Sequence, residues 1–252
     1  MSFVPRAAST PARPWFNRVF HSADPGEEDP SGLSKYPGGE PSLRRGHPTV
    51  QASRARVFLV ETVETEIAHL LEVSDLQSAA ATIVRGYGPA ILGYLAALAR
   101  DEDRADDAFS QFCEDLWRGL PGFRRDASVR TWVYKLAWHA WLRNEREAFR
   151  RRGRPIAPEE ISRLAAEVRS TTALYLRSEA KDAVARLREQ LTRAEQSLLV
   201  LRIDRGLSWT EVASVMSTPE EPLDAQTVAK RFQRVKASLR KLAEDAGLLE
   251  MR

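Results

Sequence analysis

Apolar residues recur at steps of three and four along most of the chain, the spacing that predicts amphipathic α-helices. In the last quarter of the chain these positions are Val184, Leu187, Leu191, Ala194, Leu198 and Leu201, followed by Val212, Val215, Val228, Phe232, Val235 and Leu239. Further upstream, the same spacing predicts one helix from Ser74 to Leu98 and another from Asp103 to Leu120. A weaker amphipathic pattern covers Arg54 to Val73. The sequence therefore predicts an all-α fold.

Two helix starts in the last quarter are marked by capping boxes, in which a hydroxyl residue precedes Glu by three positions. The first box joins Thr192 to Glu195, and the second joins Ser208 to Glu211. Gly206 lies between them, where it can end the first helix in a left-handed turn. Two helices joined by a short glycine turn predict a helix-turn-helix unit.

The helix expected after the capping residue Asp224 carries only positive charge, because no acidic residue occurs from Ala225 to Lys241. Its candidate DNA-contacting residues are Gln226, Thr227, Lys230, Arg231, Gln233 and Arg234. Arg, Lys and Gln side chains on one side of a helix can contact base edges or phosphates. An isolated basic helix is often only a solvated surface. The preceding pair of helices favours DNA binding here.

The predicted helix from Asp103 to Leu120 has an apolar side and an acidic, polar side. The polar side carries Asp106, Asp107, Ser110, Gln111 and Glu114. Solvation is the usual explanation of a lone acidic stripe, and a basic partner is the alternative. Cys113 lies among apolar neighbours, so we expect a buried small hydrophobe and not a nucleophile.

The segment from Val129 to Arg152 is rich in aromatic residues and then in arginine. One stripe of a helix cannot bury every ring, so some rings are expected to be partly exposed beside cations, as in proteins that bind single strands. Trp132 on its own is equally well explained as a core residue. The stronger candidates for a nucleic-acid surface are Trp138, His139 and Trp141, followed by Arg143 and Arg146. His139 has no partner at metal-ligand spacing, which favours a polar contact.

Composition adds a few constraints. The 252-residue chain has a formal net charge of +3, so nucleic-acid binding must be argued from where the charges lie. Its single cysteine excludes an intramolecular disulfide. No apolar run approaches the length of a membrane span, and the N-terminus lacks the apolar core of a secretory signal. A cytoplasmic location is therefore expected.

These patterns divide the chain into four parts. Residues 1–53 mix proline, glycine, serine and charge without sustained periodicity, so no packed core is expected there. Residues 54–154 are predicted to form a helical domain whose core starts at residue 74. Residues 155–179 are predicted to be a flexible linker, and residues 180–252 to be the helix-turn-helix domain. The predicted fold is two small helical domains joined by this linker.

Three motifs follow one another along the chain: Ala105–Trp117, Phe123-Arg124 with Val129–Ala137, and Gly206–Arg234. In order and separation they resemble the extracytoplasmic-function sigma factors of bacterial RNA polymerase. The first is similar to the acidic helix that binds the clamp helices of the polymerase β′ subunit. The second is similar to the helix that captures flipped bases of the minus-ten element, and the third to the unit that recognises the minus-thirty-five element.

The resemblance implies an initiation factor whose partners are core RNA polymerase and promoter DNA, with an anti-sigma factor as a further candidate partner. It implies no cofactor, metal or catalytic centre. The implied polymerase-binding residues are Asp106, Asp107, Gln111 and Glu114. The implied promoter-melting and minus-ten residues are Trp132, Trp138, His139, Trp141, Arg143 and Arg146. The chain departs from the family at Ser110, where Gln is usual, at His139, where Asn is common, and in the longer loop 217–224.

Two alternatives from other classes stay open at this stage. A DNA-binding regulator that does not contact polymerase accounts for the basic helix but leaves the acidic and aromatic helices unexplained. A helical protein-interaction module or accessory subunit is the other. An enzyme is disfavoured, because the sequence has no phosphate-binding glycine loop, metal-ligand spacing or convincing pair of nucleophile and base.

Overall fold

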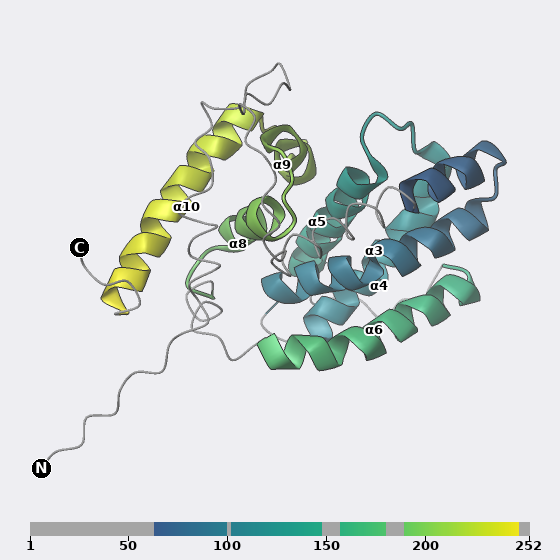
Figure 1. Cartoon of the computed structure of the whole chain (residues 1–252), viewed down its shortest axis with the longest axis horizontal. Helices are drawn as coiled ribbons and strands as arrows, with labels where there is room; N and C mark the ends of the chain where they lie inside the picture. Colours follow the sequence, from purple (N-terminus) through teal and green to yellow (C-terminus); the bar gives the residue numbers. More distant parts are fainter. Residues whose placement is uncertain (1–62, 100–101, 148–156, 180–188, 247–252) are drawn as a thin grey trace, which may run out of the picture.

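The computed structural model of the chain describes residues 63–99, 102–147, 157–179 and 189–246, and every regular element in these ranges is a helix (Figure 1). The all-α prediction is confirmed for this part of the chain. The predicted N-terminal extension lies outside the described residues. Of the weak helix predicted from Arg54 to Val73, residues 63–73 are described, and residues 63–72 are helical. None of the described helices has the length and apolar character needed to cross a membrane.

The first half of the described chain is built around three long helices. They are α3 (Leu76–Leu98), α4 (Glu102–Gly119) and α5 (Val129–Glu147), with the short 3-10 turn η1 (Leu120–Gly122) after α4. The capping residue of α3 is Asp75, whose carboxylate accepts a hydrogen bond of 3.0 Å from the Ser78 amide. Ser74, predicted to begin this helix, instead lies in the preceding turn with a φ of 60°. The helix is therefore present as predicted, but its cap lies one residue later.

A further helix, α6 (Glu159–Glu179), occupies most of the segment predicted to be a flexible linker. It packs lengthwise on α3 and also contacts α4 (Figure 1). Its buried side chains include Ile161, Ala165 and Val168, which recur at steps of four and three. A Cβ atom at Gly88 of α3 would lie 3.1 Å from a Val168 methyl group, so the glycine permits close approach. The linker prediction is wrong for residues 159–179, because this apolar stripe is buried against α3.

The last part of the described chain contains the predicted pair of capped helices. These are α8 (Arg193–Leu199), continued by the π-helical turn η2 (Val200–Asp204), and α9 (Trp209–Met216). Both predicted capping boxes are present, with Thr192 accepting from the Glu195 amide and Ser208 from the Glu211 amide. Gly206 has a φ of 66°, which confirms the predicted left-handed turn. Residues 180–188, with which the predicted helix-turn-helix domain begins, lie outside the described residues.

The long basic helix α10 (Ala225–Asp245) follows a loop and packs on α8 and α9. Asp224 caps it, as predicted, by accepting a hydrogen bond of 2.6 Å from the Thr227 amide. Val228, Phe232, Val235 and Leu239 form its buried side. This side faces α8 and α9, while Lys230, Arg234 and Arg240 are exposed on other sides of the helix.

The two halves share one continuous apolar core, because α9 packs against α5 and α8 packs against α3. At the junction the hydroxyl groups of Tyr94 and Ser197 form a buried hydrogen bond of 2.7 Å. Burial raises the pKa of the Tyr94 hydroxyl, so this group stays neutral and available for the bond. Cys113 is buried in α4, and burial raises the pKa of its thiol to about 12. The expectation of an inert, core cysteine is confirmed.

Candidate nucleic-acid interface

The first turn of α5 is anchored by a carboxylate from the preceding part of the chain. Glu64 accepts hydrogen bonds of 3.3 and 3.0 Å from the amides of Val129 and Arg130. A negative charge at this end of a helix satisfies free amides and is favoured by the helix dipole. Sequence reasoning missed Glu64, since no local pattern links it to a helix that begins 65 residues later. The contact fixes the position of the helix that carries most of the candidate site.

Trp138 and Trp141 are core residues, with 4% and 1% of their surfaces exposed. The helix α5 contacts α3, α4 and α9, so more than one of its faces is buried. The prediction that these two rings are available to stack on bases is therefore wrong for this structure. Large aromatic side chains gain most from removal of apolar surface from water. The indole N–H groups of both residues are buried, without hydrogen-bond partners among the described residues.

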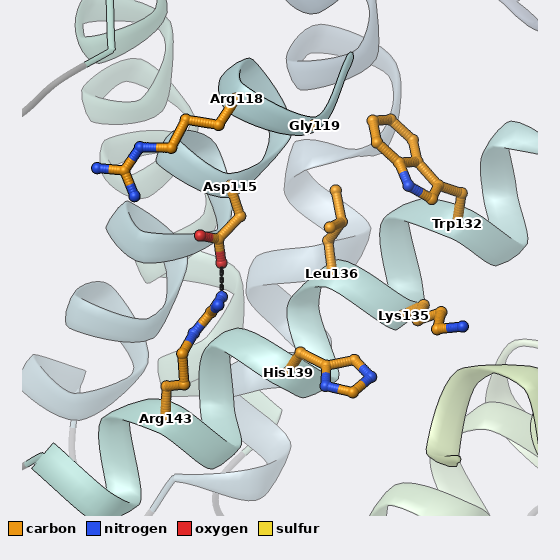
Figure 2. A pocket seen from close by; sticks show the side chains of 8 residues that line it. All are labelled: Asp115, Arg118, Gly119, Trp132, Lys135, Leu136, His139 and Arg143. Atoms are coloured by element: carbon orange, nitrogen blue, oxygen red, sulfur yellow. Dashed lines mark hydrogen bonds and ion pairs between the residues drawn. The ribbon is translucent and has the colours of Figure 1, made fainter. Parts of the chain in front are cut away.

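A shallow pocket of about 480 Å³ opens between α4 and α5, and Figure 2 shows the side chains around it. The lining residues are Asp115, Arg118 and Gly119 of α4 and Trp132, Lys135, Leu136, His139 and Arg143 of α5. Trp132 is half-buried and stacks on Phe123, with ring centroids 4.6 Å apart. Three cationic side chains and one indole ring at a single opening suit an aromatic base and its phosphate.

His139 is half-buried and belongs to this pocket. Burial, and then the charges of Lys135 and Arg143, lower the pKa of the imidazole from its usual value of 6.5. The ring is therefore neutral at neutral pH and can donate or accept a hydrogen bond. The Arg143 guanidinium forms an ion pair with Asp115, which holds it at the edge of the pocket (Figure 2). Arg146 lies in α5, but its side chain is outside the described residues.

The predicted polymerase-binding residues of α4 do not all lie on one exposed surface. Asp107 is exposed, while Asp106 and Glu114 are half-buried. Gln111 is only 8% exposed, and its side-chain nitrogen donates a hydrogen bond of 2.8 Å to Asp115. The prediction of Gln111 as a surface residue is therefore wrong, because its amide is engaged within α4.

Arg169 of α6 is a neighbour of this acidic surface that sequence reasoning missed. Its guanidinium donates a hydrogen bond of 2.8 Å to the Ser110 hydroxyl. Burial raises the pKa of Asp106, and the positive charge of Arg169 partly offsets that effect. No signal in the sequence identified Arg169, because its segment was expected to be a linker.

The candidate upstream DNA-binding residues lie on the solvent side of α10. Gln226, Lys230 and Arg234 are exposed and follow one another at steps of four, so they share one face. Thr227, Arg231 and Gln233 are half-buried beside this face. The structure therefore places three of the six predicted residues together in one solvent-exposed, mainly basic stripe.

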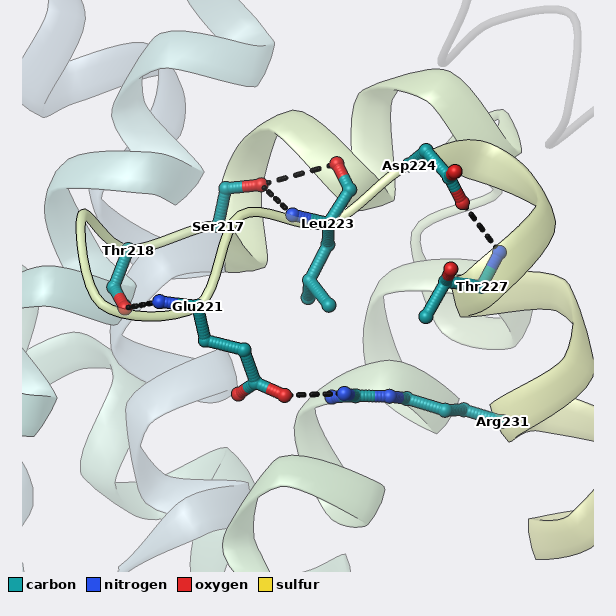
Figure 3. Close-up of polar contacts among 7 residues, drawn as sticks. All are labelled: Ser217, Thr218, Glu221, Leu223, Asp224, Thr227 and Arg231. Atoms are coloured by element: carbon teal, nitrogen blue, oxygen red, sulfur yellow. Dashed lines mark hydrogen bonds and ion pairs between the residues drawn. The ribbon is translucent and has the colours of Figure 1, made fainter.

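Arg231 is held by the loop that precedes α10. Its guanidinium forms an ion pair with Glu221, as Figure 3 shows. Within the same loop, the Ser217 hydroxyl accepts a hydrogen bond of 2.9 Å from the Leu223 amide. The Thr218 hydroxyl accepts one of 3.0 Å from the Glu221 amide. Hydrogen bonds within the loop therefore hold it in a defined conformation, in which the Glu221 carboxylate pairs with Arg231 of α10.

Comparison with known proteins gives two findings that fit this geometry. Residues 83–154 match the family Sigma-70 region 2, a range that contains α4, α5 and the pocket between them. The chain is also 26% identical over 169 residues to RNA polymerase sigma-H factor of Pseudomonas aeruginosa, across 63% of this chain and 83% of that protein.

A region 2 match and a capped helix pair after it, in a chain whose described elements are all helices, are the features of a transcription-initiation factor. The chain is a sigma factor that carries region 2 in the helices α3, α4 and α5. Sigma factors are initiation factors and not enzymes. The resemblance noted from the three sequence motifs is confirmed at the level of sigma factors.

Proposed function

We propose that this sigma factor is of the extracytoplasmic-function type, binds core RNA polymerase in the cytoplasm, recognises promoter DNA and stabilises its opened form. The observation that carries the proposal is the position of the region 2 match, which covers the α4 surface and the aromatic, basic pocket together. Two functional domains, residues 54–154 and 180–252, perform these steps. Neither domain uses a catalytic centre, metal or cofactor.

Docking to polymerase uses the acidic side of α4. Asp107 is exposed and Asp106 is half-buried beside it, so both can oppose basic residues of the β′ clamp helices. Glu114 forms an i to i+4 ion pair with Arg118, with a nitrogen to oxygen distance of 3.4 Å. This pair lies at the far end of the same surface. Gln111 supports the surface from within and does not contact the partner.

Promoter opening uses the pocket between α4 and α5. An unstacked base packs against the exposed part of Trp132, and the cations of Lys135 and Arg143 lie near its phosphate. The neutral imidazole of His139 is suited to hydrogen bonds with a base edge or sugar. Opening is driven by contacts that exist only after bases leave the duplex. This assignment omits Trp138 and Trp141, keeps Trp132 and adds Lys135.

Recognition of the upstream element uses the exposed stripe of α10, and its residues are expected to differ in effect. Arg234→Ala should cost on the order of 1–3 kcal/mol in binding free energy and relax the preference at one base pair. Lys241→Ala, more than a turn later, should weaken binding to all DNA sequences by a similar factor and reduce the salt dependence of that binding. Selection from randomised upstream elements, followed by binding at two salt concentrations, measures both effects. Identical selected sequences for wild type and variants at Gln226, Lys230 and Arg234 would place base recognition elsewhere.

Binding to core polymerase in the absence of DNA separates this proposal from a polymerase-independent regulator. Immobilised core enzyme should retain the full-length protein on a column. A mixture of the two should transcribe specifically from the promoter, which core enzyme alone does not do. A regulator would bind its operator alone and leave core enzyme unaffected. Failure to bind core, with intact helical circular dichroism, would overturn the proposed function.

A further inference from the structure

The loop between α9 and α10 spans residues 217–224, whereas the turn of a helix-turn-helix has about three or four residues. Its two ends are joined where the Ser217 hydroxyl accepts a hydrogen bond of 2.9 Å from the Leu223 amide. Nearer the tip, Thr218 and Glu221 exchange backbone hydrogen bonds of 3.1 and 3.2 Å. These bonds fix the backbone of Glu221 beside α10 (Figure 3).

Arg231 lies in the part of α10 that a helix-turn-helix presents to DNA. It belongs to the second turn of α10, and the N-terminal turns of a recognition helix contact base edges. Successive residues are separated by about 100° around a helix axis, so Arg231 lies beside the exposed stripe of Gln226, Lys230 and Arg234. It is half-buried between that stripe and the apolar side of the helix. An arginine at this position has the length and the N–H donors to bind a phosphate or a base edge.

In this structure the Arg231 guanidinium is paired with the Glu221 carboxylate, as Figure 3 shows. The two residues are ten positions apart, so the pair depends on the path of the loop and not on the helical repeat. Carboxylate and phosphate oxygens accept the same charge-assisted hydrogen bonds from arginine. Glu221 therefore occupies donors that DNA would otherwise use, and its own charge repels phosphates.

The strength of this competition follows from the exposure of the two side chains. The side chain of Arg231 is 33% exposed and that of Glu221 is 59% exposed. Ion pairs with this degree of exposure favour the paired state by about two- to fivefold. The pair is thus weak enough for a single substitution to release the arginine and strong enough for the release to be measured.

We propose that Glu221 determines which side chains of α10 contact the upstream DNA. It holds Arg231 against the loop and leaves the contacts to Gln226, Lys230 and Arg234. The inference rests on the proposed function, because it takes α10 as the helix that binds the upstream element. Arg231 is one of the six residues for which the sequence predicted DNA contact, and the ion pair removes it from that set.

Neutralisation of the carboxylate tests this role. E221Q keeps the size of the side chain and should raise the affinity of the full-length protein for random-sequence duplex DNA about two- to fivefold. It should also steepen the dependence of log K on log salt by about 0.9, because one more phosphate is contacted. R231A should change the affinity less than about twofold on its own and should abolish the gain when combined with E221Q. Fluorescence anisotropy at several salt concentrations measures all three variants.

The matched control is E220Q, which makes the same change of charge at the adjacent, exposed loop residue. A general effect of a less acidic loop appears in both loop variants, whereas dependence on Arg231 is expected for E221Q alone. The effects of E220Q and R231A should therefore be additive. Equal gains for E220Q and E221Q would overturn the proposal, as would a loss in R231A that is the same with and without E221Q.

A selection with reconstituted holoenzyme separates this inference from the proposed function. From randomised upstream elements, R231A should select the same sequence as wild type, because Arg231 makes no base contact. Loss of a base preference in R231A would overturn the role of Glu221 alone, and Arg234→Ala should still alter the selected sequence. Failure of the wild-type holoenzyme to select any upstream sequence would instead overturn the proposed function.

Discussion

Replacement of Trp141 by alanine is expected to lower the free energy of unfolding by about 3–5 kcal/mol, the range for loss of a large buried aromatic side chain. The ring is 1% exposed and lies beneath the Arg104 guanidinium, whose central carbon is 5.6 Å from the ring centroid. Trp141→Phe should cost much less, because it retains most of the volume and removes an indole N–H without a described partner. Urea unfolding followed by circular dichroism measures both variants.

Trp132 supplies the contrasting variant, because it is half-buried and lines the pocket. Trp132→Ala should destabilise the protein less and should reduce open-complex formation, since a base stacked on an aromatic ring contributes about 1–3 kcal/mol. Permanganate footprinting of a promoter bound to the reconstituted holoenzyme measures the opened bases. If Trp141→Ala unfolds at the same urea concentration as wild type but no longer supports open-complex formation, then Trp141, and not Trp132, contacts DNA.

Charge reversal at Asp106 and Asp107 is expected to weaken binding to core polymerase about 10- to 100-fold, because each attractive contact becomes a like-charge contact. Asp107 should account for most of the loss, since it is exposed while Asp106 lies near Arg169. The single variant Asp107→Lys is therefore the cleaner test. Titration of labelled protein with core enzyme gives the dissociation constant.

The matched control for this reversal is Glu167→Lys, an exposed position on α6 with the same change of charge. It should leave core affinity within about threefold of wild type, because an exposed charge away from an interface has little effect. Raising the salt concentration should reduce the difference between Asp107→Lys and wild type. Equal core affinity for both lysine variants would remove α4 from the polymerase interface.

Local structure was predictable from the sequence because its causes are local. Side-chain caps at Thr192, Ser208 and Asp224 satisfy amides within the next three residues, so short patterns identified three helix starts. The glycine turn at Gly206 follows from backbone sterics at one residue. The acidic side of α4 and the basic side of α10 also follow from periodicity within each helix.

The site depended on contacts that periodicity cannot encode. Trp138 and Trp141 are buried because α5 packs against α3, α4 and α9. The spacing of apolar residues within one helix cannot predict how many other helices surround it. The helix α6 was not predicted, because Pro155 and Pro158 come just before it and suggested a linker. Its buried residues Ile161, Ala165 and Val168 form an apolar stripe that packs on α3.

The sequence by itself determined the helical class, the main caps, the glycine turn and the three motifs of the sigma factor. Tertiary structure alone decided which aromatic rings are buried and where Glu64 and Arg169 act. The physical reason is the sequence separation between the residues that interact. Caps and periodicity depend on neighbours within a few positions, whereas burial and charge pairing depend on which helix faces arrive together after the chain folds.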